Sequence, residues 1–199
     1  MSLSDVKLFA VLENDNNTQE KTDDQIRVEK EREYVAYITQ HKNNVLKAFD
    51  EMISDTYLND VYNSDIVNAL NELKYVIEDH DNSKFSDEEF DAYRRNFYPV
   101  NDQEKEDNED AFELAWRHHY ENNDHHPEHW FTNGIAHDMS LRAILEMICD
   151  WQSFYYIGKG GAKEYWNKIK GSNDNESKFI TPNTAEQIER ILKLFNYHD

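Results

Sequence analysis

Residues that interrupt helices are scarce in this chain, whose 199 residues include 5 glycines and 3 prolines. Long segments therefore lack the two residue types that destabilise helices most. Runs of alternating β-branched and polar residues between turn signals, which are typical of strands, are almost absent. The sequence consequently predicts an all-α fold. Hydrophobic residues make up 38% of the chain, which at this length is enough for one core, so we expect a single folded domain.

Apolar residues recur at three- and four-residue steps in several segments, as on one face of a helix. Residues 13–24 are polar and lack this periodicity, so we expect an N-terminal arm or linker at 1–23 and a helical domain at 24–199. Residues 101–110 are expected to form an exposed loop. Capping signals and periodicity predict seven helices. The first four lie at 24–54, at 64–81, from a Ser86–Glu89 capping box to before Pro99, and at 109–122. The fifth begins at Asp138 or Ser140 and ends near 158, the sixth is a short aromatic segment after 161, and the last begins at Thr181.

The formal charge of the chain is -20, and no cluster of lysines and arginines stands out against it. This acidity argues against nucleic-acid binding through a charged surface. The apolar run from Val6 to Leu12 is far shorter than the roughly 20 residues of a membrane span. The single cysteine, Cys149, lies in an apolar stretch and is expected to be a small buried hydrophobe. We therefore expect a cytoplasmic protein, in the host cytoplasm if it is encoded by a phage.

Six of the nine histidines fall between His118 and His137. They belong to a larger pattern, because five separated segments each offer side chains that bind metals. Imidazole and carboxylate ligands together suit first-row transition metals, and helical bundles build such sites from several helices. The metal-capable side chains are His41, His80 with Asp81, His118 with His119, the group of His125, His126 and His129, and Glu146 with Asp150.

The chain order His, His-Asp, His, His, Asp resembles the HD-domain superfamily of metal-dependent phosphohydrolases, which are all-α proteins. Lys84 follows Asp81 by three residues, as in several branches of that superfamily. A narrower likeness, from about Tyr34 to the C-terminus, is to a phage and bacterial family of unknown function. The segments that carry it are His80-Asp81-x-Ser83-Lys84-Phe85, Ala115-Trp116-x-His118-His119-x-x-x-Asn123-x-His125-His126-x-x-x-Trp130 and Glu146-Met147-x-x-Asp150-Trp151.

The resemblance implies one or two divalent transition metal ions, from among Mn, Fe, Co, Ni and Zn. It implies His41, His80, Asp81 and Asp150 as ligands of one metal, and His119 and His126 as further ligands that hold a second. Neighbouring residues of a helix point about 100 degrees apart, so one histidine of each doublet is expected to face the metals. His118 and His125 are then expected to support the ligands from outside or to contact the substrate.

The predicted function is hydrolysis of a small phosphoester, such as a nucleotide, by metal-activated water. Lys84 is expected to contact the substrate phosphate, and Asp81 to bridge metals or orient the water. Glu146 lies one helical turn before Asp150 and is expected to fix a ligating histidine. Arg117 adds positive charge for an anionic substrate. The catalytic set is therefore Asp81, Lys84 and Glu146, and the substrate-binding set is Lys84, Arg117, His118 and His125.

Several other interpretations fit the same residues. A di-iron oxygenase on the same fold would use these ligands for redox chemistry on a polyol or phosphonate. A non-enzymatic, acidic phage-type protein that mimics DNA or binds a host factor would use them for a structural metal. Without the family likeness, His41 is typical of a solvated surface residue, Asp150 of a structural ion pair, and a His-Asp pair of a helix cap. The histidine-rich tract could also bind metal adventitiously, and the four tryptophans are assigned to packing.

Overall fold

The computed structural model describes residues 21–54, 64–171 and 177–195. It confirms the all-α class, since 76% of it is helical. The predicted arm at 1–23 lies almost entirely outside the described residues. The α-helices are α2 (Asp23–Ser54), α3 (Ser64–Leu73), α4 (Phe90–Phe97), α5 (Asp102–Glu106), α6 (Glu109–Asn122), α7 (Leu141–Ser153), α8 (Ala162–Gly171) and α9 (Pro182–Leu194).

Short elements connect these helices. The 3-10 helices are η3 (Ile77–Asp79), η4 (Asn82–Phe85), η5 (Pro127–Trp130), η6 (Phe154–Ile157) and η7 (Ser177–Phe179). Strands β1 (Phe131–Thr132) and β2 (Ile135–Ala136) pair antiparallel, with Phe131 opposite Ala136. Asn133 and Gly134 join them with φ values of 54° and 79°, and this Asn-Gly pair is the usual choice where both turn residues need positive φ.

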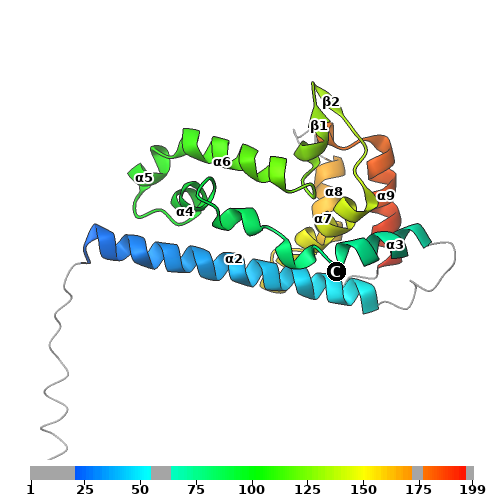
Figure 1. Ribbon diagram of the computed structural model, residues 1–199, viewed down its shortest axis with the longest axis horizontal. Coiled ribbons are helices and arrows are strands. Elements are labelled where there is room, and N and C mark those ends of the chain that lie inside the picture. The colour runs from blue at the N-terminus through cyan, green and yellow to red at the C-terminus, as the bar shows by residue number, and fades with distance from the viewer. Residues whose placement is uncertain (1–20, 55–63, 172–176, 196–199) are drawn as a thin grey trace, which may run out of the picture.

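Helix α2 is the long axis of the molecule, and two hydrophobic clusters pack along it (Figure 1). Helices α4 and α6 cover its N-terminal half around Tyr34 and Ile38. Helix α7, the most completely buried helix, packs on its C-terminal half, and α3, α8 and α9 pack around α7. His41 lies on the buried face of α2 at the junction of the two clusters, between Ile38 and Val45. This junction is where the candidate site forms.

Three helix predictions are confirmed, two of them by side-chain caps. Ser140 Oγ accepts a hydrogen bond from the Ala143 amide at 3.1 Å, and Thr181 Oγ1 accepts one from the Thr184 amide at 3.1 Å. These contacts begin α7 and α9 at the predicted residues, because the cap side chains satisfy amides that have no partner within the helix. Helix α6 has the predicted limits, Glu109 and Asn122.

Other predicted boundaries were wrong. Helix α3 ends at Leu73 instead of 81, because the chain tightens into η3 and Asp81 adopts a left-handed φ of 58°, which an α-helix excludes. The capping box at Ser86 is replaced by a later start at Phe90, since the Glu89 side chain bonds to histidines of α6. The expected loop at 101–110 contains α5, which Asn101 caps by accepting from the Glu104 amide at 2.9 Å.

No helix in the described part of the chain is both long and apolar enough to cross a membrane. Cys149 is fully buried in α7, as expected of a small hydrophobe.

Candidate metal centre

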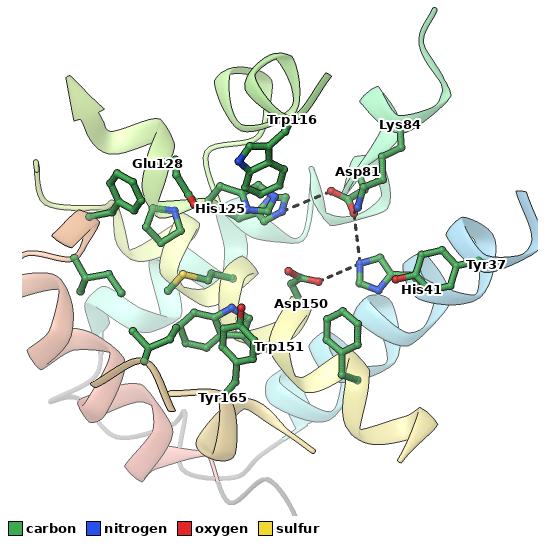
Figure 2. A pocket seen from close by; sticks show the side chains of 17 residues that line it. Tyr37, His41, Asp81, Lys84, Trp116, His125, Glu128, Asp150, Trp151 and Tyr165 are labelled. Atoms are coloured by element: carbon green, nitrogen blue, oxygen red, sulfur yellow. Dashed lines mark hydrogen bonds and ion pairs between the residues drawn. The ribbon is translucent and has the colours of Figure 1, made fainter. Parts of the chain in front are cut away.

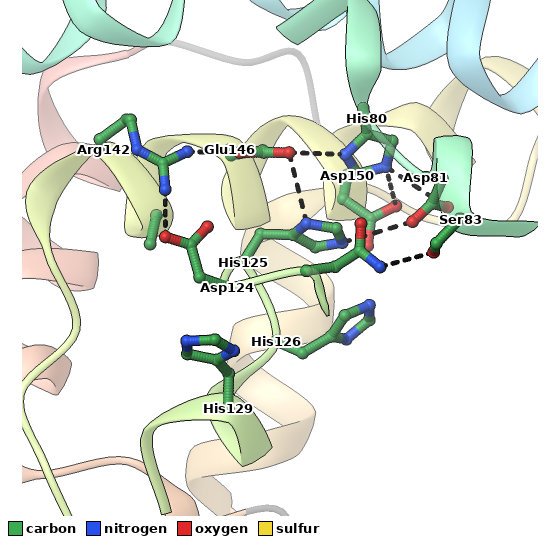
Figure 3. A network of polar contacts seen from close by, with 12 residues as sticks. His80, Asp81, Ser83, Asp124, His125, His126, His129, Arg142, Glu146 and Asp150 are labelled. Atoms are coloured by element: carbon green, nitrogen blue, oxygen red, sulfur yellow. Dashed lines mark hydrogen bonds and ion pairs between the residues drawn. The ribbon is translucent and has the colours of Figure 1, made fainter. Parts of the chain in front are cut away.

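Five elements bring imidazoles and carboxylates together where α2, α6 and α7 meet. Helix α2 contributes His41, and α6 contributes His119. The turn between η3 and η4 contributes His80 and Asp81, and Lys42 of α2 holds this turn by donating to the Glu78 carbonyl at 3.0 Å. The remaining side chains come from the segment before η5, with His125 and His126, and from α7, with Glu146 and Asp150. Figure 2 shows His41, Asp81, His125 and Asp150 converging, and Figure 3 adds His80, His126 and Glu146.

One group of ligand atoms surrounds Oδ2 of Asp81. The Nε2 atoms of His41 and His80 lie 3.4 and 3.5 Å from this oxygen. The same two nitrogens lie 3.0 and 3.8 Å from Oδ1 of Asp150. We call His41, His80, Asp150 and Asp81 Oδ2 the first ligand group.

A second group surrounds the other oxygen of Asp81. The Nε2 atoms of His119 and His125 lie 3.2 and 3.6 Å from Oδ1 of Asp81. His126 adds a third imidazole, with its Nε2 atom 2.9 Å from Nε2 of His119. We call His119, His125, His126 and Asp81 Oδ1 the second ligand group. Asp81 therefore presents one carboxylate oxygen to each group, as a carboxylate that bridges two metals would.

The outer nitrogens of four of these imidazoles are held by other side chains. Nδ1 of His80 and of His125 lie 3.0 and 3.3 Å from Oε1 of Glu146 (Figure 3). Nδ1 of His119 lies 2.9 Å from Oε2 of Glu89, and Nδ1 of His41 lies 3.1 Å from Oγ of Ser153. A carboxylate can only accept, so Glu146 and Glu89 receive the Nδ1–H of His80, His125 and His119 and leave the Nε2 atoms of these rings directed inward. The Ser153 hydroxyl holds the ring of His41 in a corresponding orientation. This is the usual outer arrangement of histidines that ligate metals.

The separations and the bonding of these atoms fit a metal ion. Ligand nitrogens about 2.0–2.1 Å from a metal lie roughly 3 Å apart when adjacent in its coordination shell. Three of the separations within the two groups, at 3.0, 3.2 and 2.9 Å, are close to that value. The other four, at 3.4, 3.5, 3.6 and 3.8 Å, are somewhat longer. Among the described residues, four buried atoms of the cluster make no hydrogen bond: Nε2 of His80 and His125, and Oδ1 of Asp81 and Asp150. Buried polar atoms are rarely left in that condition, and coordination of a cation would satisfy them. These residues can therefore hold a metal ion.

The electrostatics of the cluster favour positive charge at its centre. Burial opposes ionisation of Glu146, but His125 and His80 outweigh it and lower the pKa of Glu146 to about 2. Burial likewise opposes ionisation of Asp81, yet Lys84 and His80 hold its pKa well below the ordinary value. Burial would lower the pKa of His41, but Asp150 and Asp81 raise it to about 9. The carboxylates are thus ionised at neutral pH and attract a cation.

His126 is electrostatically different from His41. Burial, together with the neighbouring His125 and His119, lowers its pKa well below that of a free histidine. Its imidazole is therefore neutral at pH 7 and has a lone pair available for a metal.

A cavity of about 260 Å³ opens beside the cluster (Figure 2). Lys84 lines it, with Nζ 2.5 Å from Asp81 Oδ2. Burial would lower the pKa of Lys84, but Asp81 outweighs that effect and raises it, so the lysine is charged. Trp116 and Trp151, which the sequence assigned to packing, also line this cavity.

The structure brings most of the predicted site residues together. His41 is 7% exposed, which rules out a solvated position on α2. In the helical doublet, His119 is fully buried in the second ligand group, whereas His118 is one-third exposed and pairs with Glu89 at 2.7 Å. In the other doublet both His125 and His126 reach the group. The backbone at His126 is extended, so the argument from helical geometry does not apply there.

Arg117 is not brought to the ligand cluster. Its side chain is 54% exposed, 4.0 Å from Glu113, and it does not line the cavity beside Lys84. It lies two residues before His119 on α6, about 200 degrees away around the helix, and so points away from the face that carries His119.

Sequence reasoning missed the residues that hold the cluster from outside. Glu89 is fully buried and serves His118 and His119 of α6. Asn123 donates to Ser83 Oγ at 2.7 Å, and Ser83 Oγ lies 3.2 Å from Nδ1 of His119. Arg142 donates to Oε2 of Glu146 at 3.0 Å and also contacts Asp124. For Glu89 the sequence indicated a different role, because its spacing from Ser86 matched a capping box at the start of a helix.

Comparison with known proteins gives one family match. A model of a family of unknown function (DUF5662) matches residues 30–194, a span that contains every residue of both ligand groups. No curated protein and no solved structure matches the chain. Because the match covers most of its length, the chain belongs to this family.

Proposed function

We propose that the protein is a metal-dependent phosphohydrolase of the HD type that acts on a small phosphoester such as a nucleotide. One observation carries the proposal. Four imidazoles are fixed through Nδ1 and point Nε2 at the two oxygens of one carboxylate, Asp81, beside a charged lysine that lines a cavity. Such a set of ligands suits first-row transition metals. The adjoining lysine suits an anionic group.

Each of these residues has a different role in the proposed reaction. The two ligand groups would hold one divalent metal each, and metals bound there acidify water and polarise a phosphoryl oxygen. Lys84 donates a hydrogen bond to the phosphoryl group, and Asp81 orients the attacking water. The water oxygen bonds to phosphorus, the ester P–O bond breaks, and the proton lost by the water passes to the departing alcohol. Glu146 positions the rings of His80 and His125 throughout.

A di-iron oxygenase is a second candidate. The observation in its favour is the shared carboxylate, because two adjacent groups of histidines and carboxylates on helices also suit a pair of iron ions. The two candidates differ in the metal that they need. Stoichiometric iron, together with oxygen consumption, would favour the oxygenase.

Metal content and turnover of three variants test the proposal. The protein is purified without a chelator, and its metals are measured by elemental analysis. We expect one or two equivalents in the wild type, and loss of metal and activity in Asp81→Ala. Lys84→Ala should retain the metals and the fold but lose most turnover of a phosphomonoester. Lys105→Ala, which removes an exposed lysine of α5, is the matched control and should behave like the wild type.

The absence of bound metal, even after incubation with Mn²⁺, would contradict the proposal. Full activity of Lys84→Ala would contradict the role of that lysine. If Asp81→Ala loses metal and unfolds while no variant ever hydrolyses an ester, the metal is structural. The acidic binding protein would then be the better account.

A further inference from the structure

Tyr37 lines the cavity beside the ligand groups, as do His41, Asp81, Lys84 and Asp150. It precedes His41 by about one turn of α2, so both side chains leave the helix on the same side. In Figure 2 the Tyr37 side chain extends from α2 alongside His41, with its hydroxyl oxygen at the end that faces the cavity. Neither the sequence pattern nor the proposed reaction assigns this tyrosine a role.

The ring of Tyr37 is held by two neighbouring rings. It stacks on His41, with the centroids 6.2 Å apart and the planes at 10°, and it packs against Tyr98 at 6.1 Å and 49°. His41 is in turn held by Ser153 through Nδ1. A tyrosine side chain has few rotatable bonds, so a ring fixed in this way presents its hydroxyl to a ligand with little ordering cost.

The hydroxyl of Tyr37 is not committed to another protein group. Among the described residues, none forms a hydrogen bond with it. Lys84 is the only lysine or arginine among the described residues that line the cavity, and it already donates to Asp81 at 2.5 Å. The hydroxyl is therefore a donor that a ligand in the cavity can use without breaking a contact within the protein.

The charges around the hydroxyl favour its use as a neutral donor. Burial raises the pKa of Tyr37, and although Lys84 opposes this shift, Asp150 adds to it. The hydroxyl therefore keeps its proton at neutral pH. Asp81 and Asp150 repel an anionic ligand in the same part of the cavity, and the charge of Lys84 is shared with Asp81. A further hydrogen bond to the ligand offsets part of that repulsion.

We infer that Tyr37 is a substrate-binding residue whose hydroxyl donates a hydrogen bond to an oxygen of the phosphoryl group, beside Lys84. The inference rests on the proposed function, which places a phosphoryl group at this lysine. The bond is present as soon as the ligand is bound, so it strengthens the binding of substrates and of non-hydrolysable analogues alike.

The variant Tyr37→Phe removes the hydroxyl and keeps the ring that stacks on His41. Tyr98→Phe is the matched control, because Tyr98 is half-buried and packs against Tyr37 but does not line the cavity. Dissociation constants of methylphosphonate are measured by calorimetry on the full-length proteins as purified, and their metals by elemental analysis. We expect Tyr37→Phe to bind methylphosphonate about 10- to 100-fold more weakly, as for the loss of a hydrogen bond to a charged group. Its metal content should be unchanged, and Tyr98→Phe should behave like the wild type.

Turnover of phenyl phosphate by the same three proteins is measured in parallel. In Tyr37→Phe we expect KM to rise by a similar factor while kcat stays nearly constant, because the bond is present both before and during the reaction. Equal phosphonate affinities in the wild type and Tyr37→Phe would overturn the inference, as would an equal loss in Tyr98→Phe. Loss of metal in Tyr37→Phe would also overturn it, because the tyrosine would then support the ligand groups instead of the substrate. A fall in kcat with unchanged KM and phosphonate affinity would exclude a bond in the bound ground state.

The two measurements separate this inference from the proposed function. If methylphosphonate binds and Tyr37→Phe alone weakens it, but no ester is hydrolysed, the contact of Tyr37 stands and the phosphohydrolase fails. If the wild type and Tyr37→Phe hydrolyse phenyl phosphate with the same kcat and KM, the phosphohydrolase stands and the inference fails. If the wild type neither binds the phosphonate nor hydrolyses the ester, both fail.

Discussion

Replacing Glu146 by Gln should weaken metal binding in both ligand groups. The Oε1 atom of Glu146 contacts Nδ1 of His80, in the first group, and Nδ1 of His125, in the second. A glutamine keeps the volume but offers one neutral acceptor where two imidazoles need a carboxylate. Loss of such an outer partner typically reduces metal affinity by about 10- to 100-fold, which corresponds to about 1.4–2.7 kcal/mol.

The matched control is Glu89→Gln. Among the ligand histidines, Glu89 serves only His119, in the second group, where its Oε2 atom lies 2.9 Å from Nδ1. We therefore expect Glu89→Gln to weaken one binding step and Glu146→Gln to weaken both. Competition titrations of Mn²⁺ or Zn²⁺ against a chromogenic chelator resolve the two steps. Equal and unchanged affinities in both variants would refute the reasoning that these carboxylates orient the ligating rings.

The other predictions concern stability. Glu104→Ala should lower the free energy of unfolding by about 3 kcal/mol, because it removes the bidentate partner of the buried Arg94, whose bonds to Glu104 are 2.8 and 2.9 Å long. Urea denaturation followed by tryptophan fluorescence measures this change. An unchanged denaturation midpoint would show that Asp91, the remaining partner of Arg94, suffices. Arg190 lowers the pKa of Asp65 to about 2, so their ion pair should stabilise the fold above about pH 4 and lose this effect as the pH falls towards 2. The pair is largely exposed, so the difference in unfolding free energy between wild type and Asp65→Asn should stay below about 1 kcal/mol. This difference should vanish at acid pH. A difference that grows on acidification would contradict the assignment.

Local signals in the sequence were sufficient for the helical class and for several helix ends. Ser140 and Thr181 begin α7 and α9 as expected, because a cap involves only residues three apart in the chain. The apolar stripe of α2 could also be read directly, since its period follows from the geometry of the helix. Predictions from local sequence failed where a side chain can bond either to a nearby group or to a distant one. Glu89 matched a capping box, yet its carboxylate bonds to histidines about 30 residues away.

The types of the metal-capable residues and their order along the chain were visible in the sequence, but their grouping was not. That His125 belongs with His119 and His126 depends on an extended backbone before η5, which no helical rule describes. That Arg117 points away from the cluster depends on how α6 is rotated against α4, η4 and η5. Tertiary packing decided which oxygen of Asp81 faces the imidazoles of His41, His119 and His125, because those contacts join residues that are 38 to 44 positions apart in the chain. The sequence alone thus determined the helices and the residues that can bind a metal, because both follow from local features of the chain. The fold decided the site, because its contacts join distant segments.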